Sequence, residues 1–153
     1  MSLPTNLPDA ELLQLLKQHQ SRTDVHLYYG VHEEPQITHV NQANCEMTCE
    51  FLVTDNDISA SGTLDEGWLG TVTDNTTAIL IGVMGERGQT SVSTSISVQG
   101  IMPIRPNTLV EMHCKLTNQG GIQPHATVAF RDKMNPKVVY AVGSHTKFYK
   151  SNL

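Results

Sequence analysis

The chain has 153 residues, of which 39% are hydrophobic, 16% charged and 5% aromatic. This composition supplies the core of one domain and excludes a disordered or low-complexity polymer. The formal net charge of −5 argues against nucleic acid as the main partner, although an acidic protein can still bind a phosphate-bearing ligand through local donors.

Two helices are predicted. The first starts at residues 7–11, where Pro8 lies in the first turn and two acids face the positive end of the helix dipole, and its leucines form an apolar stripe that reaches about Gln18. The second runs from Glu66 to about Gly85, with residues 86–88 as its C-cap. Its inward face is expected to consist of Leu69, Val72, Thr76, Ile79, Leu80 and Val83.

Several segments alternate apolar and polar residues, which is typical of half-buried strands. One covers residues 44–53, and residues 37–40 can extend it; four more are expected at residues 90–98, 109–117, 125–131 and 137–149. Residues 20–35 and 54–61 read as irregular or loop. One curved antiparallel sheet wraps a single long helix most economically, so we predict an α+β fold of this kind. The edges of such a sheet lead us to expect dimerisation or higher association.

Other patterns exclude several classes of site. The three cysteines, Cys45, Cys49 and Cys114, contain no CxxC motif and are interpreted as reduced core thiols. The seven histidines show no HExxH or other metal-binding spacing, so we predict no metal. No GxSxG motif is present, which disfavours an α/β-hydrolase. No basic leader or run of about 20 apolar residues occurs, so we expect neither a secretory signal nor a membrane span.

A glycine-flanked turn at residues 62–67 directly precedes the long helix, and Asp74 lies about two turns inside that helix. This layout places backbone N–H groups at a helix N-terminus near one carboxylate. Such a combination suits acyl chemistry, because the N–H groups can bind an oxyanion and the carboxylate can activate water.

Over roughly residues 40–150 the sequence resembles the hotdog-fold thioesterases, specifically the small acyl-CoA thioesterases that are PaaI-like or similar to thioesterase superfamily member 2. That family reads G-T-L-H-G-G before its central helix and V-D-N inside it. This chain reads G-T-L-D-E-G at residues 62–67 and T-D-N at residues 73–75, at the same interval. Three further motifs follow in the family's order: E-R-G at 86–88, S-V at 91–92 and G-S-H-T-K at 143–147.

The resemblance implies a hotdog domain, which we expect over residues 36–153, after the predicted helix and irregular lead over residues 1–35. It also implies a homodimer with active sites at the subunit interface, often a dimer of dimers. The implied reaction is hydrolysis of acyl-CoA to free acid and coenzyme A, with no metal and no cofactor apart from the coenzyme A of the substrate. The expected location is the cytoplasm, with the mitochondrion as the alternative.

The same resemblance assigns site residues. Asp74 corresponds to the family's catalytic acid, which acts as base or nucleophile at the thioester carbonyl. Glu66 and Gly67 stand where the family has two glycines, at the helix start whose backbone N–H binds the oxyanion. Ser91 corresponds to a serine that positions water or the thioester, and Ser59 to an asparagine that orients water or substrate. Residues expected to contact coenzyme A or line its groove are Arg87, Ser93, Val98, Gly120, His145 and Lys147.

The sequence departs from the family at Asp65 and Glu66. Asp65 replaces a histidine that helps to polarise or orient the thioester, and an ionised aspartate cannot donate a hydrogen bond. The Glu66 side chain can block the substrate or repel the oxyanion, although its backbone N–H is retained. A second hypothesis is therefore a catalytically impaired hotdog protein that binds acyl-CoA or another ligand, or serves as an assembly module. Both acids would then mainly stabilise the helix N-terminus, and Asp74 would be a solvated or Asn75-paired acid.

Overall fold

The computed structural model describes residues 7–20, 34–85, 91–119 and 121–150. Its elements, in chain order, are α1 (Asp9–Gln20), β1 (Gln36–Asn41), β2 (Glu46–Leu52), the 3₁₀ helix η1 (Asp55–Asp57), α3 (Glu66–Met84), β3 (Ser91–Gly100), β4 (Leu109–Asn118), β5 (His125–Asp132) and β6 (Val139–Tyr149). In the described residues the six strands form one sheet in the order β1-β2-β4-β5-β6-β3. All neighbouring strands are antiparallel.

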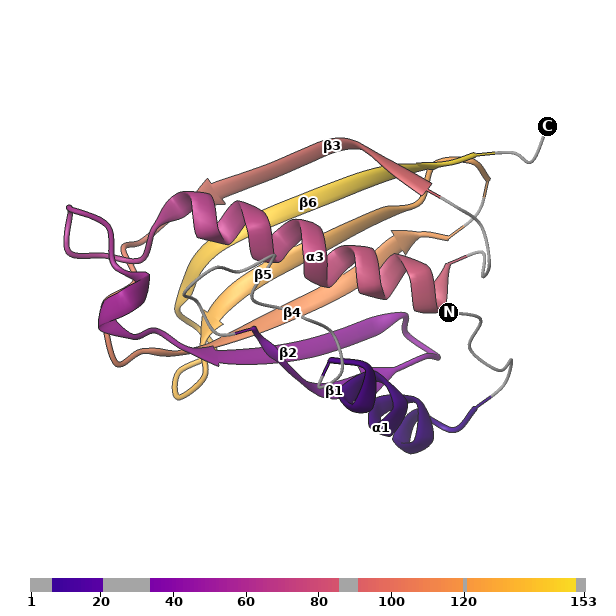
Figure 1. Ribbon diagram of the computed structural model, residues 1–153, viewed down its shortest axis with the longest axis horizontal. Helices are drawn as coiled ribbons and strands as arrows, with labels where there is room; N and C mark the ends of the chain where they lie inside the picture. The colour runs from indigo at the N-terminus through magenta and orange to yellow at the C-terminus, as the bar shows by residue number, and fades with distance from the viewer. Residues whose placement is uncertain (1–6, 21–33, 86–90, 120, 151–153) are drawn as a thin grey trace.

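The sheet curves around α3, which crosses its concave face and contacts β3, β4, β5 and β6, while α1 packs beside β1 (Figure 1). This is the predicted α+β architecture, including the additional N-terminal helix. Strand residues that alternate toward α3 are buried and form the core: Met47, Cys49, Phe51, Val110, Met112, Cys114, Ala126, Val128 and Phe130. No helix in the described ranges has the length and apolar character needed to cross a membrane.

The buried face of α3 is more polar than an ordinary core face. It carries Thr73, Thr76 and Thr77 among its apolar residues, and each of these threonines is at most 4% exposed. Trp68 is also buried and packs edge-on against Phe51, with ring centroids 4.5 Å apart. The structure therefore gives Trp68 a place in the core of the subunit.

Both ends of the long helix α3 are capped by hydrogen bonds. Asp65 is the N-cap, and its side chain accepts a hydrogen bond from the N–H of Trp68 at 3.1 Å. Gly85 is the C-cap, and its N–H donates to the carbonyl of Ile81 at 2.8 Å. The helix therefore ends just before the predicted cap at residues 86–88, which lies outside the described residues, as do residues 21–33 of the predicted irregular lead.

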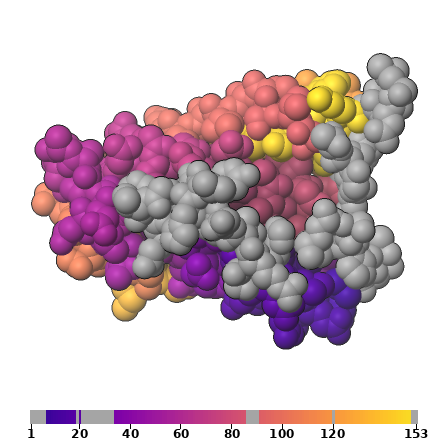
Figure 2. Space-filling view, in the orientation of Figure 1, coloured from indigo at the N-terminus to yellow at the C-terminus, as the bar shows by residue number. Residues whose placement is uncertain are grey.

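Two sequence-based expectations need correction. The single strand expected at residues 44–53, with 37–40 as an extension, is a hairpin of β1 and β2, and Cys45 lies in its turn with a positive φ of 55°. The alternation in residues 90–98 does not mark a half-buried strand either. β3 is an edge strand whose Val92 and Ile96 are each 41% exposed. Figure 2 shows β3 along one edge of the molecule, opposite α1.

Candidate active site

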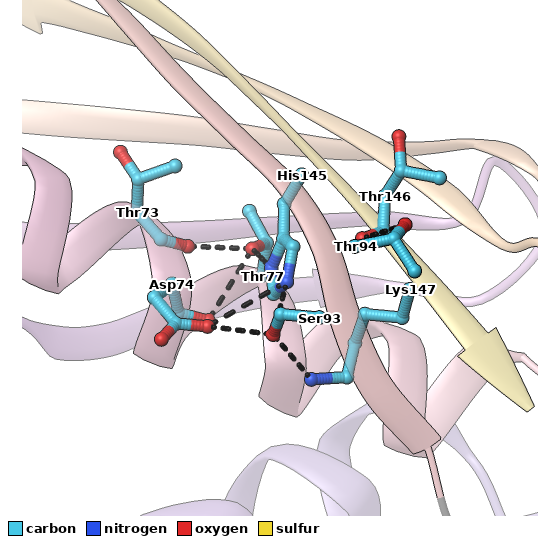
Figure 3. Close-up of polar contacts among 8 residues, drawn as sticks. All are labelled: Thr73, Asp74, Thr77, Ser93, Thr94, His145, Thr146 and Lys147. Atoms are coloured by element: carbon cyan, nitrogen blue, oxygen red, sulfur yellow. Dashed lines mark hydrogen bonds and ion pairs between the residues drawn. The ribbon is translucent and has the colours of Figure 1, made fainter.

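Asp74 lies in the middle of α3, on the side that faces β3 and β6 (Figure 3). Its side chain is 43% exposed, so a small molecule can reach the carboxylate from solvent. Asp74 Oδ1 is 3.5 Å from the hydroxyl of Ser93 on β3 and 3.5 Å from Nε2 of His145 on β6. The carboxylate is thus half-exposed at the edge of a polar cluster.

His145 is the buried centre of this cluster, with no exposure to solvent. Its Nδ1 lies 2.7 Å from Thr77 Oγ1 on α3, and its Nε2 lies 2.9 Å from Ser93 Oγ. Lys147 Nζ donates to the same Ser93 oxygen at 3.1 Å. Strand β6 therefore supplies the imidazole and the ammonium, β3 the hydroxyl, and α3 the carboxylate and the threonine.

The surroundings of His145 favour a neutral imidazole. Burial lowers the pKa of His145 below its usual value, because the charged ring loses its hydration. The ammonium of Lys147 and the ring of His125 lower this pKa further, whereas the carboxylate of Asp74 raises it. The net direction is downward, so the ring is uncharged near neutral pH.

The N-terminus of α3 is held in place by main-chain bonds. The N–H of Leu64 donates to the carbonyl of Ile104 at 2.9 Å, and the N–H of Asp65 donates to the carbonyl of Asp57 at 3.0 Å. Gly62 has a φ of +76°, which explains the glycine at the start of this turn. The rigid turn fixes where the first N–H groups of the helix point.

The N–H groups of Glu66 and Gly67 belong to the first turn of α3, where a helix offers no internal acceptor. Asp65 caps the N–H of Trp68, and no hydrogen bond within the described part of the chain engages the N–H of Glu66 or Gly67 outside the helix. A cavity of about 260 Å³ lies beside them, and the exposed Glu66 stands at its rim. The cavity lining also includes Leu64, Leu69, Ile101, Met102, Ile104 and Tyr140.

Other residues predicted for the site lie apart from Asp74. Ser91 precedes Ser93 by two residues on β3 and pairs with Tyr149, so Ser93 is the serine that the structure places beside the carboxylate. Ser59 is hydrogen-bonded within its own loop, to Ser61 Oγ at 2.7 Å.

Val98 lies farther along β3 and is partly buried. His145, which is expected to contact coenzyme A or line its groove, is completely buried, and Lys147 is accessible beside it. Arg87 and Gly120 lie outside the described residues.

Sequence reasoning did not identify Thr77. A signal was present, because threonines at positions 73, 76 and 77 interrupt the otherwise apolar face of the helix. Their spacing from Asp74 places Thr77 one turn further along α3 on the side that meets β6. The residues that the structure describes contain no group of three or more His, Cys, Asp or Glu side chains arranged to hold a metal ion.

The fold is the hotdog fold of solved thioesterases. Thioesterase superfamily member 2 of zebra fish superposes with a TM-score of 0.74 at 22% identity, over 90% of this chain and 98% of that one. The PaaI protein from the phenylacetic acid degradation operon of E. coli gives a TM-score of 0.70 at 10% identity, over 92% and 95% of the two chains. A Streptococcus mutans protein bound to acetyl CoA gives 0.66 at 13% identity, over 80% and 95%.

The sequence match to a curated protein covers a smaller share of this chain than these structural matches do. A Caenorhabditis elegans protein named as a proposed esterase is 27% identical over 114 residues, which are 74% of this chain. The match spans 66% of that protein, slightly less than two thirds of its length. No family model matches the sequence.

Proposed function

We propose that this protein is an acyl-CoA thioesterase, which hydrolyses an acyl-CoA to a free acid and coenzyme A. The observation that carries the proposal is the half-exposed Asp74 carboxylate, placed beside Ser93 and Lys147 on a hotdog scaffold. The likeness to thioesterase structures, and to a Streptococcus mutans protein that was solved bound to acetyl CoA, supports this substrate class. The proposed esterase of Caenorhabditis elegans supports ester-type hydrolysis more generally.

In the proposed reaction Asp74 acts as general base. It accepts a proton from a water molecule while the water oxygen attacks the thioester carbonyl carbon. The N–H groups of Glu66 and Gly67 bind the resulting oxyanion. Collapse of this intermediate breaks the carbon–sulfur bond, and the departing thiolate takes the proton from Asp74, so the base is regenerated. Because His145 is buried and neutral, the proton remains with the exposed carboxylate during the step.

The expectation that the helix N–H groups lie near the carboxylate needs correction, because within a single chain the two are too far apart to serve one carbonyl. Asp74 follows Glu66 by eight residues on α3, and a helix rises 1.5 Å per residue, so they are separated by about 12 Å along its axis. We therefore propose that Asp74 of one subunit acts with the α3 N-terminus of a second subunit.

The exposed edge strand β3 is the surface proposed for this pairing. Most of its residues are exposed, including Val92 and Ile96, and an unpaired edge is a template for another strand. Antiparallel pairing of two β3 strands around a two-fold axis sets two α3 helices side by side in opposite directions. A homodimer of this kind, alone or as a dimer of dimers, completes two equivalent sites.

The substrate contacts follow from charge and polarity. Lys147 provides an accessible positive charge beside the site and suits a phosphate or the developing thiolate, and we propose Arg87 and Gly120 as further coenzyme A contacts from the sequence pattern. The cavity at the α3 N-terminus is lined by Leu69, Ile101, Met102 and other apolar residues, together with the polar Thr63 and Glu66. It is the proposed seat of the acyl group.

The direct test measures free-thiol release from a panel of acyl-CoAs of increasing chain length. Wild type and Asp74→Asn are compared with Asp55→Asn, which makes the same chemical change at an exposed acid in η1. We expect turnover by wild type and Asp55→Asn, and a loss of at least about 100-fold in Asp74→Asn. Absence of turnover for every chain length, from folded dimeric protein, would overturn the proposal.

The second candidate is a binding or assembly module that does not hydrolyse its ligand. The observation that favours it is the Glu66 side chain, whose carboxylate stands at the rim of the cavity. Its Oε1 lies 3.5 Å from the point where a Cβ atom would stand if Gly100 were replaced by a residue with a side chain. A negative charge there opposes an oxyanion. Binding of coenzyme A measured by calorimetry, without thiol release, is the result this candidate predicts.

A further inference from the structure

We infer that Thr77 and His145 act as a positioning relay. Thr77 fixes which ring nitrogen of His145 carries the hydrogen, so Ser93 donates its hydroxyl proton to His145. The Asp74 carboxylate is then free to take a proton from water. The proton arrangement itself follows from hydrogen-bond geometry together with the neutral state of the buried His145 ring. Only its effect on turnover rests on the proposed thioester hydrolysis.

The first step is the direction of the Thr77 hydroxyl. Its oxygen lies 2.5 Å from the carbonyl oxygen of Thr73, one turn earlier on α3. Two oxygens at this distance repel each other unless a proton lies between them, so Thr77 donates to Thr73. A threonine hydroxyl has one proton only. Toward Nδ1 of His145, at 2.7 Å, Thr77 can therefore act only as an acceptor, and Nδ1 must carry a hydrogen.

The second step is the direction of the Ser93 hydroxyl. A neutral imidazole has one N–H, so the Nε2 atom of His145 is a bare acceptor. Ser93 Oγ lies 2.9 Å from it and supplies the matching donor. The ammonium of Lys147 donates to the same serine oxygen at 3.1 Å, which occupies a lone pair. The proton of Ser93 is thus used on His145, and the 3.5 Å contact from Ser93 to Asp74 is left without a proton.

The third step concerns the charge of His145. The groups that act on the ring come from three packed elements: Asp74 on α3, His125 on β5 and Lys147 on β6. Burial and the two basic groups lower the pKa of His145, and Asp74 opposes them. The neutral form that the relay requires is therefore the form present near neutral pH.

Protonation of His145 reverses the arrangement. Nε2 then carries a hydrogen, which it donates to Ser93 Oγ at 2.9 Å, so the hydroxyl proton of Ser93 is released toward the Asp74 carboxylate. A carboxylate that accepts this hydrogen bond and has a charged imidazole 3.5 Å away is a weaker base. Thr77 and His145 therefore act as positioning residues, which set whether Asp74 is available to water.

The test reads the tautomer of His145 directly by nitrogen-15 NMR of the full-length protein at neutral pH, with His145→Asn used to assign the ring signals. We expect a protonated Nδ1 and a bare Nε2 in wild type. Thr77→Ser, which keeps the hydroxyl, should retain this tautomer, and Thr77→Val, which replaces the hydroxyl with a methyl group, should shift the proton toward Nε2. A wild-type ring protonated at Nε2 would overturn the inference even if Thr77→Val did not fold.

The kinetic consequence provides a second reading. Thr77→Val should lower kcat for thiol release by up to about 100-fold with little change in KM, and Thr77→Ser should restore most of the rate. An unchanged kcat in a Thr77→Val protein with an altered tautomer would refute the link to catalysis. If no variant hydrolyses any acyl-CoA while the tautomers are as expected, the proposed function fails and the proton arrangement stands.

Discussion

A proline at position 66 would test the oxyanion role of the α3 N-terminus without dismantling the helix. Glu66 is the first helical residue after the N-cap Asp65, and proline is favoured at this position because its missing N–H has no acceptor inside the helix. Asp65 has φ −64° and ψ 125°, the region that a residue before proline prefers. Glu66→Pro therefore removes one N–H donor and the carboxylate, whereas Glu66→Ala removes the carboxylate alone.

The magnitude follows from what one oxyanion donor contributes. Loss of a single donor costs about 2.7–4 kcal/mol, or roughly 100- to 1,000-fold in kcat. Thiol release by Glu66→Pro should fall by this factor relative to Glu66→Ala, while the two thermal unfolding curves stay close together. Glu66→Ala should equal or exceed wild type, because the negative charge at the cavity rim is gone. Equal rates in the proline and alanine variants would refute the oxyanion assignment.

Two further predictions concern stability. A Cβ atom at Gly143 would lie 3.0 Å from the backbone oxygen of Ser97, which cannot easily move, so Gly143→Ala should lower the free energy of unfolding by about 1–3 kcal/mol. Gly82→Ala, in open space on α3, should raise this free energy by about 0.5–1 kcal/mol. Chemical denaturation at matched protein concentration measures both changes. A Gly143→Ala protein with the free energy of unfolding of wild type would contradict the packing argument. The lowered pKa of His145 means that the unfolded chain binds its proton more readily, so stability should fall as pH drops from 6.5 through that lowered pKa. His145→Asn should flatten this dependence of stability on pH, whereas replacement of the exposed His39 should leave the dependence unchanged. A wild-type stability that does not vary with pH in this range would contradict the burial argument.

Much of the fold could be predicted because local chemistry and tertiary structure agree. The spacing of apolar residues predicted that α3 starts at Glu66, as it does, and alternation predicted β4 and β5 closely. Alternation did not predict the exposure of β3, because burial depends on a strand's place in the sheet. Val92 and Ile96 alternate as core residues do, yet they lie on an edge strand.

The site could be predicted only in part, for a related reason. Asp74 and the helix start lie on one element, so their spacing is visible in the sequence. The cluster around Asp74 instead depends on register: the pairing of β3 with β6 sets Ser93 opposite Lys147, and the packing of β6 on α3 brings His145 to Thr77. Thr77 and His145 are 68 positions apart in the sequence, and no local pattern encodes a contact of this kind.

The measurement that tests the account most directly mixes two inactive variants. Asp74→Asn and Glu66→Pro are unfolded together, refolded as a mixture and assayed for thiol release beside each variant refolded alone. If Asp74 of one subunit works with the α3 N-terminus of the other, mixed dimers contain one intact site. The mixture should then recover about a quarter of wild-type activity, since random pairing makes half of the dimers mixed. Activity no greater than that of the separate variants, in a mixture shown to contain mixed dimers, would contradict a shared thioesterase site.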